Sequence, residues 1–176
     1  DLQGFLYLSG AILAVNLIWV LQIYQNSKAS EKAIQEMCTE IRKDIVKSIE
    51  QVKKDIRPDM IFTHYKNDLN IDHKITYEAT ITATRPMQNE IVSEIYSFEI
   101  LSSTEWNYPL SFSPDVFFDI SQTLELKQKA MQEYSSELCE FPHPRSIEGI
   151  ELNAKYHGMR VGKKYVEAFK SVRVVR

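Results

Sequence analysis

The residues with the clearest chemical potential lie between Pro58 and His73. Met60–Phe62 is a short apolar run that predicts a buried strand, and a polar loop leads from it to Asp72 and His73. In an open α/β sheet, a strand end that brings a carboxylate beside an imidazole is a common basis for a hydrolytic or metal site. His73 is the candidate metal ligand, and either Asp72 or Asp68 could orient it or relay a proton.

The histidines alone do not establish a metal enzyme. A catalytic zinc usually has three protein ligands and one open position. None of the four histidines is paired at the spacing of an HExxH motif; they are His64, His73, His143 and His157. A single histidine near the start of a helix is more often solvated or structural than a ligand, so both interpretations of His73 stay open.

Further loops contain groups that suit a polar or carbohydrate ligand. Glu105 and Trp106 share a loop with several hydroxyl side chains, and carbohydrate sites combine stacking aromatic rings with polar groups. The alternative is a capped turn with a packed tryptophan. Arg145 could bind an anionic or hydroxylated ligand, or it and its neighbours could satisfy the N-terminus of a helix. His64, just after the first strand, is another candidate for substrate binding.

The elements that must position these residues follow from the spacing of apolar side chains. The expected helices cover residues 37–56, 72–84, 121–138, 146–158 and 161–172, and the expected strands cover residues 60–62, 91–101 and 116–118. Pro58 ends the first helix, Asp72 caps the second, and Ser146 caps the fourth. Helices that alternate with short buried strands predict an α/β fold with a mostly parallel sheet flanked by helices.

The composition is that of an ordinary globular protein. The chain has 176 residues, of which 44% are hydrophobic and 26% charged, and its formal net charge is -3. This charge gives no electrostatic basis for nucleic-acid binding. Cys38 and Cys139 are far apart and have no cysteine or histidine cluster around them, which predicts two free thiols in a reducing compartment. Because the first residue is Asp1, we expect a fragment or a processed form.

Residues 4–24 form an apolar, uncharged head. This is about the length that crosses a bilayer as a helix, and Trp19 and Tyr24, followed by lysines, fit an interfacial belt. The alternatives are a buried element of a soluble fold, or a segment foreign to the ancestral fold. The protein is accordingly expected to be cytoplasmic, or else membrane-anchored through this head. We separate residues 1–36, as head and linker, from residues 37–176.

Eight short motifs from residue 44 onward stand in the order in which one enzyme family carries them. They are Arg57–Asp59 with Phe62–His64, Asn67–His73, Thr84–Pro86, Ser102–Trp106, Val116–Ile120, Phe141–Ser146, Gly158–Gly162 and Tyr165–Phe169. On these residues the chain resembles the PIG-L/LmbE family of metal-dependent N-deacetylases. The resemblance implies a Rossmann-like α/β fold for residues 37–176.

The resemblance also implies a reaction and roles for three residues. In this family a zinc-bound water attacks the carbonyl of an acetamide, often on an N-acetylglucosamine-type sugar. His73 matches the third metal ligand, and Asp72 matches the shell that handles protons and orients ligands. Asn70 stands where many members have a histidine; it can donate a hydrogen bond to an oxyanion but cannot shuttle a proton at neutral pH.

The resemblance implies zinc as the cofactor and an amino-sugar conjugate as the small-molecule partner, with no nucleic acid. Membrane contact through residues 4–24 and a homo-oligomer are open alternatives. The family's N-terminal Ala-His-Pro-Asp-Asp-Glu motif, which supplies two ligands and the general base, has no match in residues 1–43. The chain therefore resembles the C-terminal portion of a deacetylase. The other interpretations are a non-catalytic, membrane-tethered sugar-binding remnant and a truncated, inactive product.

Overall fold

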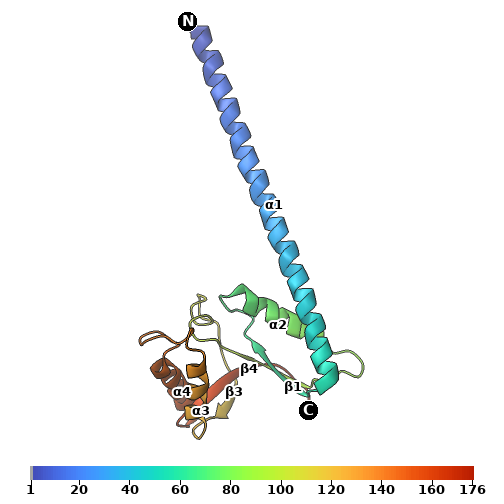
Figure 1. Ribbon diagram of the computed structural model, residues 1–176, viewed down its shortest axis with the longest axis vertical. Helices are drawn as coiled ribbons and strands as arrows, with labels where there is room; N and C mark the ends of the chain where they lie inside the picture. Colours follow the sequence, from blue (N-terminus) through green and yellow to red (C-terminus); the bar gives the residue numbers. More distant parts are fainter. Residues whose placement is uncertain (1) are drawn as a thin grey trace. The chain divides into compact units, whose positions relative to one another are not determined.

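A computed structural model describes the chain from residue 2 to residue 176, with side chains from residue 21 onward. The chain forms two units, residues 1–41 and residues 42–176. Helix α1 (Leu2–Ile56) makes up the first unit and continues into the second, which also holds the sheet and the remaining helices (Figure 1).

The expectations for the apolar head fall largely outside the described side chains. They depend on residues 4–24, and the side chains of residues 1–20 are not described. In the part of the chain that is described, no helix combines the length and the apolar character that crossing a membrane requires.

Helix α1 ends where the sequence predicts, although it begins far earlier than residue 37. Its last helical residue is Ile56, and Arg57 has a φ of 55°. The following Pro58 disfavours a right-handed helical conformation at Arg57, so the helix cannot continue through this residue. The turn delivers the chain directly into β1 (Met60–His64).

The sheet has four strands in the order β1-β2-β4-β3, where β2 is Glu94–Phe98, β3 is Val116–Asp119 and β4 is Val166–Val174. The α/β class with flanking helices is confirmed, but the sheet is mixed. β1 and β2 are parallel, whereas β4 is antiparallel to both β2 and β3. Helix α2 (Ile71–Ala83) lies in the connection from β1 to β2, as parallel neighbours need a long crossover.

The prediction of a final helix over residues 161–172 is wrong, because this segment contains β4. Helix α4 (Ile147–Val161) ends at Gly162, whose φ of 70° is the left-handed cap that glycine adopts readily. Beyond the cap, Val166 and Ala168 are buried on alternate positions of an extended chain. The apolar residues of this segment are spaced three and four apart, as on a helix. This spacing is possible in β4 because both faces of the strand are partly buried.

The other helices lie at the predicted positions: α2 is shifted by one residue, α3 is shorter than predicted, and α4 extends three residues further. α3 covers Leu124–Glu133, and α4 begins after Ser146, whose Oγ accepts a hydrogen bond from the N–H of Gly149 at 2.8 Å. The cap prediction for Ser146 is therefore confirmed. The cap prediction for Asp72 is wrong: α2 starts at Ile71, so Asn70 occupies the cap position, and Asp72 lies in the first turn.

The core lies between the sheet and two helices. α2 packs against β1 and α4 packs against β4, while α3 lies beside α4 (Figure 1). Ala79, Ile95 and Val166 are exposed by 2% or less. The predicted thiols are free, with Cys38 half-buried and Cys139 exposed.

A partly buried ion pair joins the end of α1 to the segment that enters β2. Lys53 Nζ donates to Glu90 Oε2 and to the carbonyl of Ala83, both at 2.6 Å. Burial alone would raise the pKa of Glu90, but the hydrogen bonds from Lys53 and from the N–H of Val92 outweigh it and lower this pKa. The carboxylate form of Glu90 is therefore favoured by folding.

We expect Glu90→Gln to lower the free energy of unfolding by about 1–3 kcal/mol at pH 7, the usual range for a hydrogen bond to a charged group. Because the folded-state pKa of Glu90 is lowered, this stabilisation is present above the unfolded pKa of about 4.3 and is lost as pH falls through the folded value. Urea unfolding at pH 7 and at successively lower pH would measure it. Glu133→Gln, at an exposed position of α3, is the control; the same deficit at every pH would contradict the assignment.

Candidate functional site

The candidate site lies at the carboxyl ends of the two parallel strands. His64 ends β1 and is paired in register with Phe98, which ends β2. A short loop follows β1 and turns into α2, and this brings His73 into the first turn of that helix. In open α/β sheets this edge is where ligands bind, because loops from neighbouring strands converge there.

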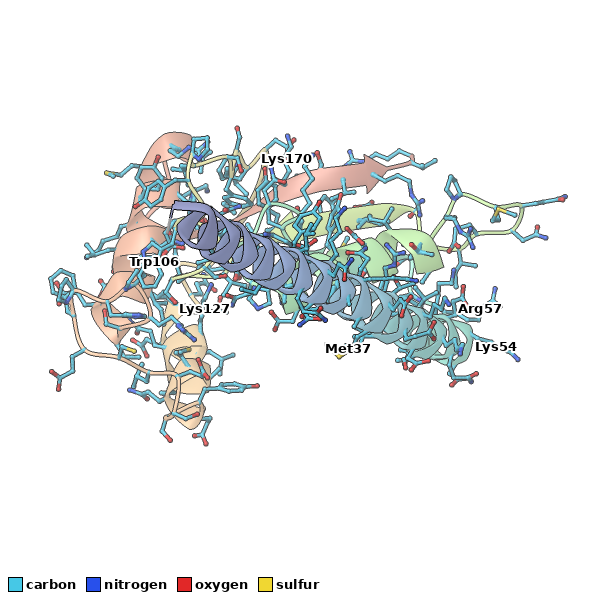
Figure 2. The ribbon with its side chains drawn as sticks, turned by 90° about the horizontal axis from the view of Figure 1, so that it is seen from above. Met37, Lys54, Arg57, Trp106, Lys127 and Lys170 are labelled. Carbon is cyan, nitrogen blue, oxygen red and sulfur yellow. The ribbon has the colours of Figure 1, made fainter. Side chains whose placement is uncertain are left out.

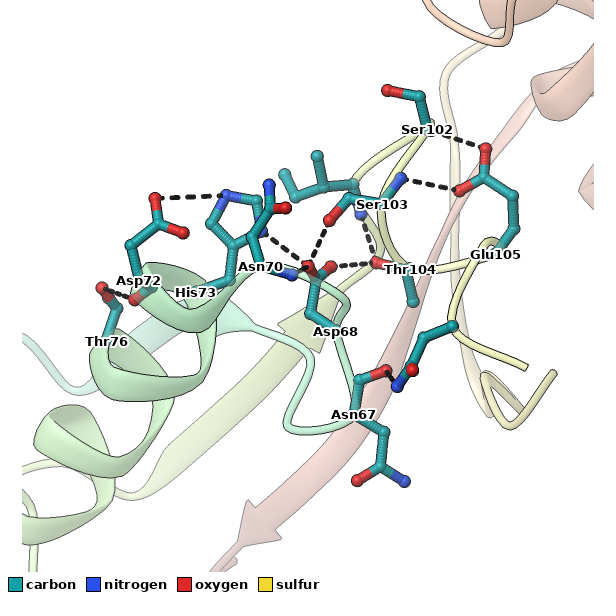
Figure 3. A network of polar contacts seen from close by, with 12 residues as sticks. Asn67, Asp68, Asn70, Asp72, His73, Thr76, Ser102, Ser103, Thr104 and Glu105 are labelled. Carbon is teal, nitrogen blue, oxygen red and sulfur yellow. Dashed lines mark hydrogen bonds and ion pairs between the residues drawn. The ribbon is translucent and has the colours of Figure 1, made fainter. Parts of the chain in front are cut away.

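At the centre of the site is the carboxylate of Asp68, which is fully buried (0% exposed). It takes four hydrogen bonds (Figure 3). Its Oδ1 is 2.9 Å from the backbone N of Asn70 and 2.9 Å from Nδ1 of His73, and it also accepts from the hydroxyl of Ser103. Its Oδ2 accepts from Thr104 Oγ1 at 2.6 Å. Asp68 thus joins the loop after β1, the start of α2 and the loop after β2.

The direction of these hydrogen bonds can be worked out from the neighbouring backbone. Thr104 Oγ1 accepts from the N–H of Ile100 at 2.8 Å, so its own hydrogen is free to point at Asp68. The N–H of Asn70 can only donate. Burial alone would raise the pKa of Asp68, but the donors from Ser103, Thr104, Asn70 and His73 together lower it. Asp68 is therefore an ionised acceptor at both oxygens.

This arrangement determines the tautomer of His73. Its Nδ1 faces an ionised oxygen and must carry the hydrogen, so in the neutral imidazole Nε2 keeps its lone pair. His73 is 14% exposed at the side chain, and its Nε2 is 4.0 Å from Asp72 Oδ2. A buried carboxylate that accepts a hydrogen bond from one imidazole nitrogen is the arrangement found behind metal-ligating histidines.

His64 packs flat against His73. The two ring centroids are 4.3 Å apart at an interplanar angle of 18°, and Phe98 contacts the His64 ring at 5.1 Å. Burial, helped by the neighbouring His73, lowers the pKa of His64, while Asp68 and Asp72 act in the opposite direction. A neutral His64 therefore supports His73 from one side, and its buried Nδ1 has no hydrogen-bond partner among the described residues.

The two residues that the family resemblance assigns to catalysis lie on the open side of the network. The side chain of Asp72 is 76% exposed. Asn70 uses its backbone N–H for Asp68, and its side chain makes no capping bond to α2. Both side chains are thus available to a ligand beside His73 (Figure 3).

The predicted substrate-binding residues differ in how far they are available to a ligand; they are Glu105, Trp106 and Arg145. Glu105 accepts from the N–H groups of Ser102 and Ser103, at 2.6 and 3.3 Å, so it stabilises its own turn. Trp106 (labelled in Figure 2) is 41% exposed, and its ring forms a T-shaped contact with His143 at a centroid distance of 5.4 Å.

Arg145 forms an ion pair with Glu137. Its backbone N–H donates to His143 Nδ1 at 3.1 Å. In this arrangement its guanidinium braces the loop before α4.

Sequence reasoning missed the share of Ser103 and Thr104 in the site and favoured Asp72 over Asp68. Asp68, Ser103 and Thr104 are exposed by 0–2%. The sequence does hold a signal: an aspartate five residues before the histidine, and two hydroxyl residues after the next strand. It can be interpreted only when the two loops are known to lie in contact.

The donor set for a metal is incomplete in the described residues. His73 offers the imidazole nitrogen that zinc prefers, but no group of three histidine, cysteine or acidic side chains gathers closely enough among these residues to hold an ion. Since a catalytic zinc usually has three protein ligands, the described residues by themselves do not fit a complete zinc site.

No model of a known protein family matches the chain. Among solved structures, teicoplanin deacetylase Orf2 in its zinc-inhibited form has a TM-score of 0.61 at 16% identity, over 78% of this chain and 54% of that one. N,N'-diacetylchitobiose deacetylase from Pyrococcus horikoshii has a TM-score of 0.52 at 21% identity, over 76% of this chain and 51% of that one. The chain has the fold of the LmbE/PIG-L-type deacetylases.

This fold is shared with an enzyme of another class. GalB, the 4-carboxy-2-hydroxymuconate hydratase from Pseudomonas putida, has a TM-score of 0.52 at 24% identity, over 76% of this chain and 61% of that one. The fold alone therefore does not determine the reaction. The chain spans 51–61% of the length of these three proteins. The deacetylases among them support the resemblance to the PIG-L/LmbE family.

We expect Asp68→Asn to lower the free energy of unfolding by at least about 2 kcal/mol. The substitution replaces one carboxylate oxygen with an NH₂ group, whose hydrogens would face a donor that now points at that oxygen. Urea unfolding of the chain would measure the loss. Asp72→Asn, the same change on an exposed carboxylate four residues away, should stay within about 0.5 kcal/mol of the unchanged chain. Equal stability of the two variants would contradict the central role of Asp68.

Proposed function

We propose that this chain is part of a metal-dependent N-deacetylase that acts on an N-acetylglucosamine-type sugar conjugate. The observation that supports this most strongly is the buried Asp68, which holds Nδ1 of His73 and leaves its Nε2 on the side of the exposed Asp72. The motif resemblance and the likeness to structures of two deacetylases agree with it. His73 is proposed as one metal ligand, and the other ligands would come from residues that the described part does not bring together.

A bound metal ion would polarise the amide carbonyl and activate a water molecule. The chain's own residues would do the remaining work. Asp72, exposed beside His73, would accept and return a proton. Asn70, with its side-chain amide uncommitted to the helix cap, would donate a hydrogen bond where negative charge develops on the carbonyl oxygen. Trp106, which is partly exposed, would contact the sugar with its ring.

A second candidate is a binding protein that keeps the sugar contacts without turnover. The exposed Trp106 ring beside His143 favours this function, since it needs no metal. The two candidates differ in one product: the deacetylase releases acetate and the binding protein does not.

We expect the protein in its full natural length, supplied with zinc, to release acetate from an N-acetylglucosaminyl conjugate. His73→Ala should reduce turnover by more than about 100-fold, because even residues that only support a ligand contribute 10–100-fold. Acetate assay and bound-zinc content would be measured together. Lys74→Ala, the next position on α2, is the control and should retain activity; unchanged turnover in His73→Ala would remove the ligand assignment.

For Asn70, we expect Asn70→Ala to lower kcat by about 10²-fold with little change in KM, since an oxyanion donor acts in the transition state. Steady-state kinetics on the same conjugate would test this. A rise in KM at constant kcat would assign Asn70 to substrate binding instead.

A further inference from the structure

Thr104 occupies an unusual position for a loop residue. It is 2% exposed, and its Oγ1 lies between two partners, accepting from the N–H of Ile100 at 2.8 Å and donating to Asp68 Oδ2 at 2.6 Å. The hydroxyl therefore links the backbone N–H of Ile100, two residues beyond β2, to the carboxylate that holds His73.

The loop that carries Thr104 is braced from several sides. Ser102 has a φ of 65°, and the Glu105 carboxylate holds the N–H groups of Ser102 and Ser103. At the far end of the loop, Asn107 Nδ2 donates to the carbonyl of Asn67 at 3.0 Å. The loop thus has little freedom to move Thr104 away from Asp68.

We propose that Thr104 is a positioning residue for His73 and acts through Asp68. The two oxygens of Asp68 are not equivalent in this respect. Oδ1 has three donors, namely Asn70, Ser103 and His73, whereas Thr104 is the donor recorded at Oδ2. Without the Thr104 hydroxyl, a buried ionised oxygen lacks its partner, and the carboxylate turns toward other donors.

That rotation takes Oδ1 out of line with His73 Nδ1. The imidazole is then free to change tautomer or orientation, and its Nε2 lone pair no longer points in one direction. Loss of Ser103 is less serious, because Oδ1 keeps two donors. The inference rests on the proposed function only in identifying Nε2 as the atom that a metal would use; the positioning itself is present without metal.

The test is the tautomer of His73, read from long-range ¹H–¹⁵N spectra of the ¹⁵N-labelled chain at neutral pH. In the unchanged chain we expect the hydrogen on Nδ1. His157 provides an internal reference of the opposite kind, because its Nδ1 faces Arg160 and its Nε2 lies 2.8 Å from Glu99 Oε1.

Thr104→Val keeps the shape and removes the hydroxyl, whereas Thr104→Ser keeps the hydroxyl. We expect Thr104→Val to reduce the ratio of the Nδ1–H to the Nε2–H tautomer about tenfold, and Thr104→Ser to leave it within twofold. Thr82→Val, on α2 outside the network, is the matched control. In the full-length protein, Thr104→Val should also weaken zinc binding about tenfold, with recovery in Thr104→Ser.

Three results would overturn the inference: an Nε2–H tautomer of His73 in the unchanged chain, an unchanged ratio in folded Thr104→Val, or equal behaviour of the valine and serine variants. The first needs no variant, so it decides the matter even if Thr104→Val fails to fold. Failure of the proposed function looks different: the tautomer responds as expected, but the full-length protein neither binds zinc nor releases acetate.

Discussion

The burial of one negative charge governs the architecture of the site. An ionised carboxylate inside a protein is costly unless donors replace its lost water, and Asp68 has four of them. These donors come from the loop after β1, the first turn of α2 and the loop after β2. The hydrogen bonds that compensate the buried charge of Asp68 therefore form only when the three segments fold together. The geometry of His73 follows from it, because its imidazole is one of the donors.

The sheet places these segments within reach of one another. β1 and β2 run parallel and in register, so their following loops leave from the same edge. The crossover helix α2 returns from that edge and packs on β1, with Ala79 fully buried in the contact. α4 packs against the other half of the sheet with α3 beside it, and the loop before α4 carries His143, which contacts Trp106. The site is thus built mainly by the first crossover unit.

Much of this could be predicted from the sequence, and the exceptions have physical reasons. The end of α1, the Ser146 cap and β1 follow from local rules about proline, serine and apolar runs. β4 was mistaken for a helix because Val161, Tyr165 and Phe169 are spaced as on a helix face, and only Gly162 marks the break. The partnership of Asp68 with Thr104 spans 36 residues, and no local pattern contains it. His73 was singled out by motif, but its tautomer depends on that distant partner.

One edge of the sheet lies open beside the site. β1 stands at the end of the strand order, so in the described part of the chain it has a neighbouring strand on one side only. Met60 and Phe62 on this strand are 38% and 44% exposed. An open parallel edge with apolar side chains readily accepts another extended segment. β1 ends in His64, so the end of any strand that paired with this edge in the same direction would lie beside the stacked rings of His64 and His73. Addition of a strand would therefore complete or obstruct the site.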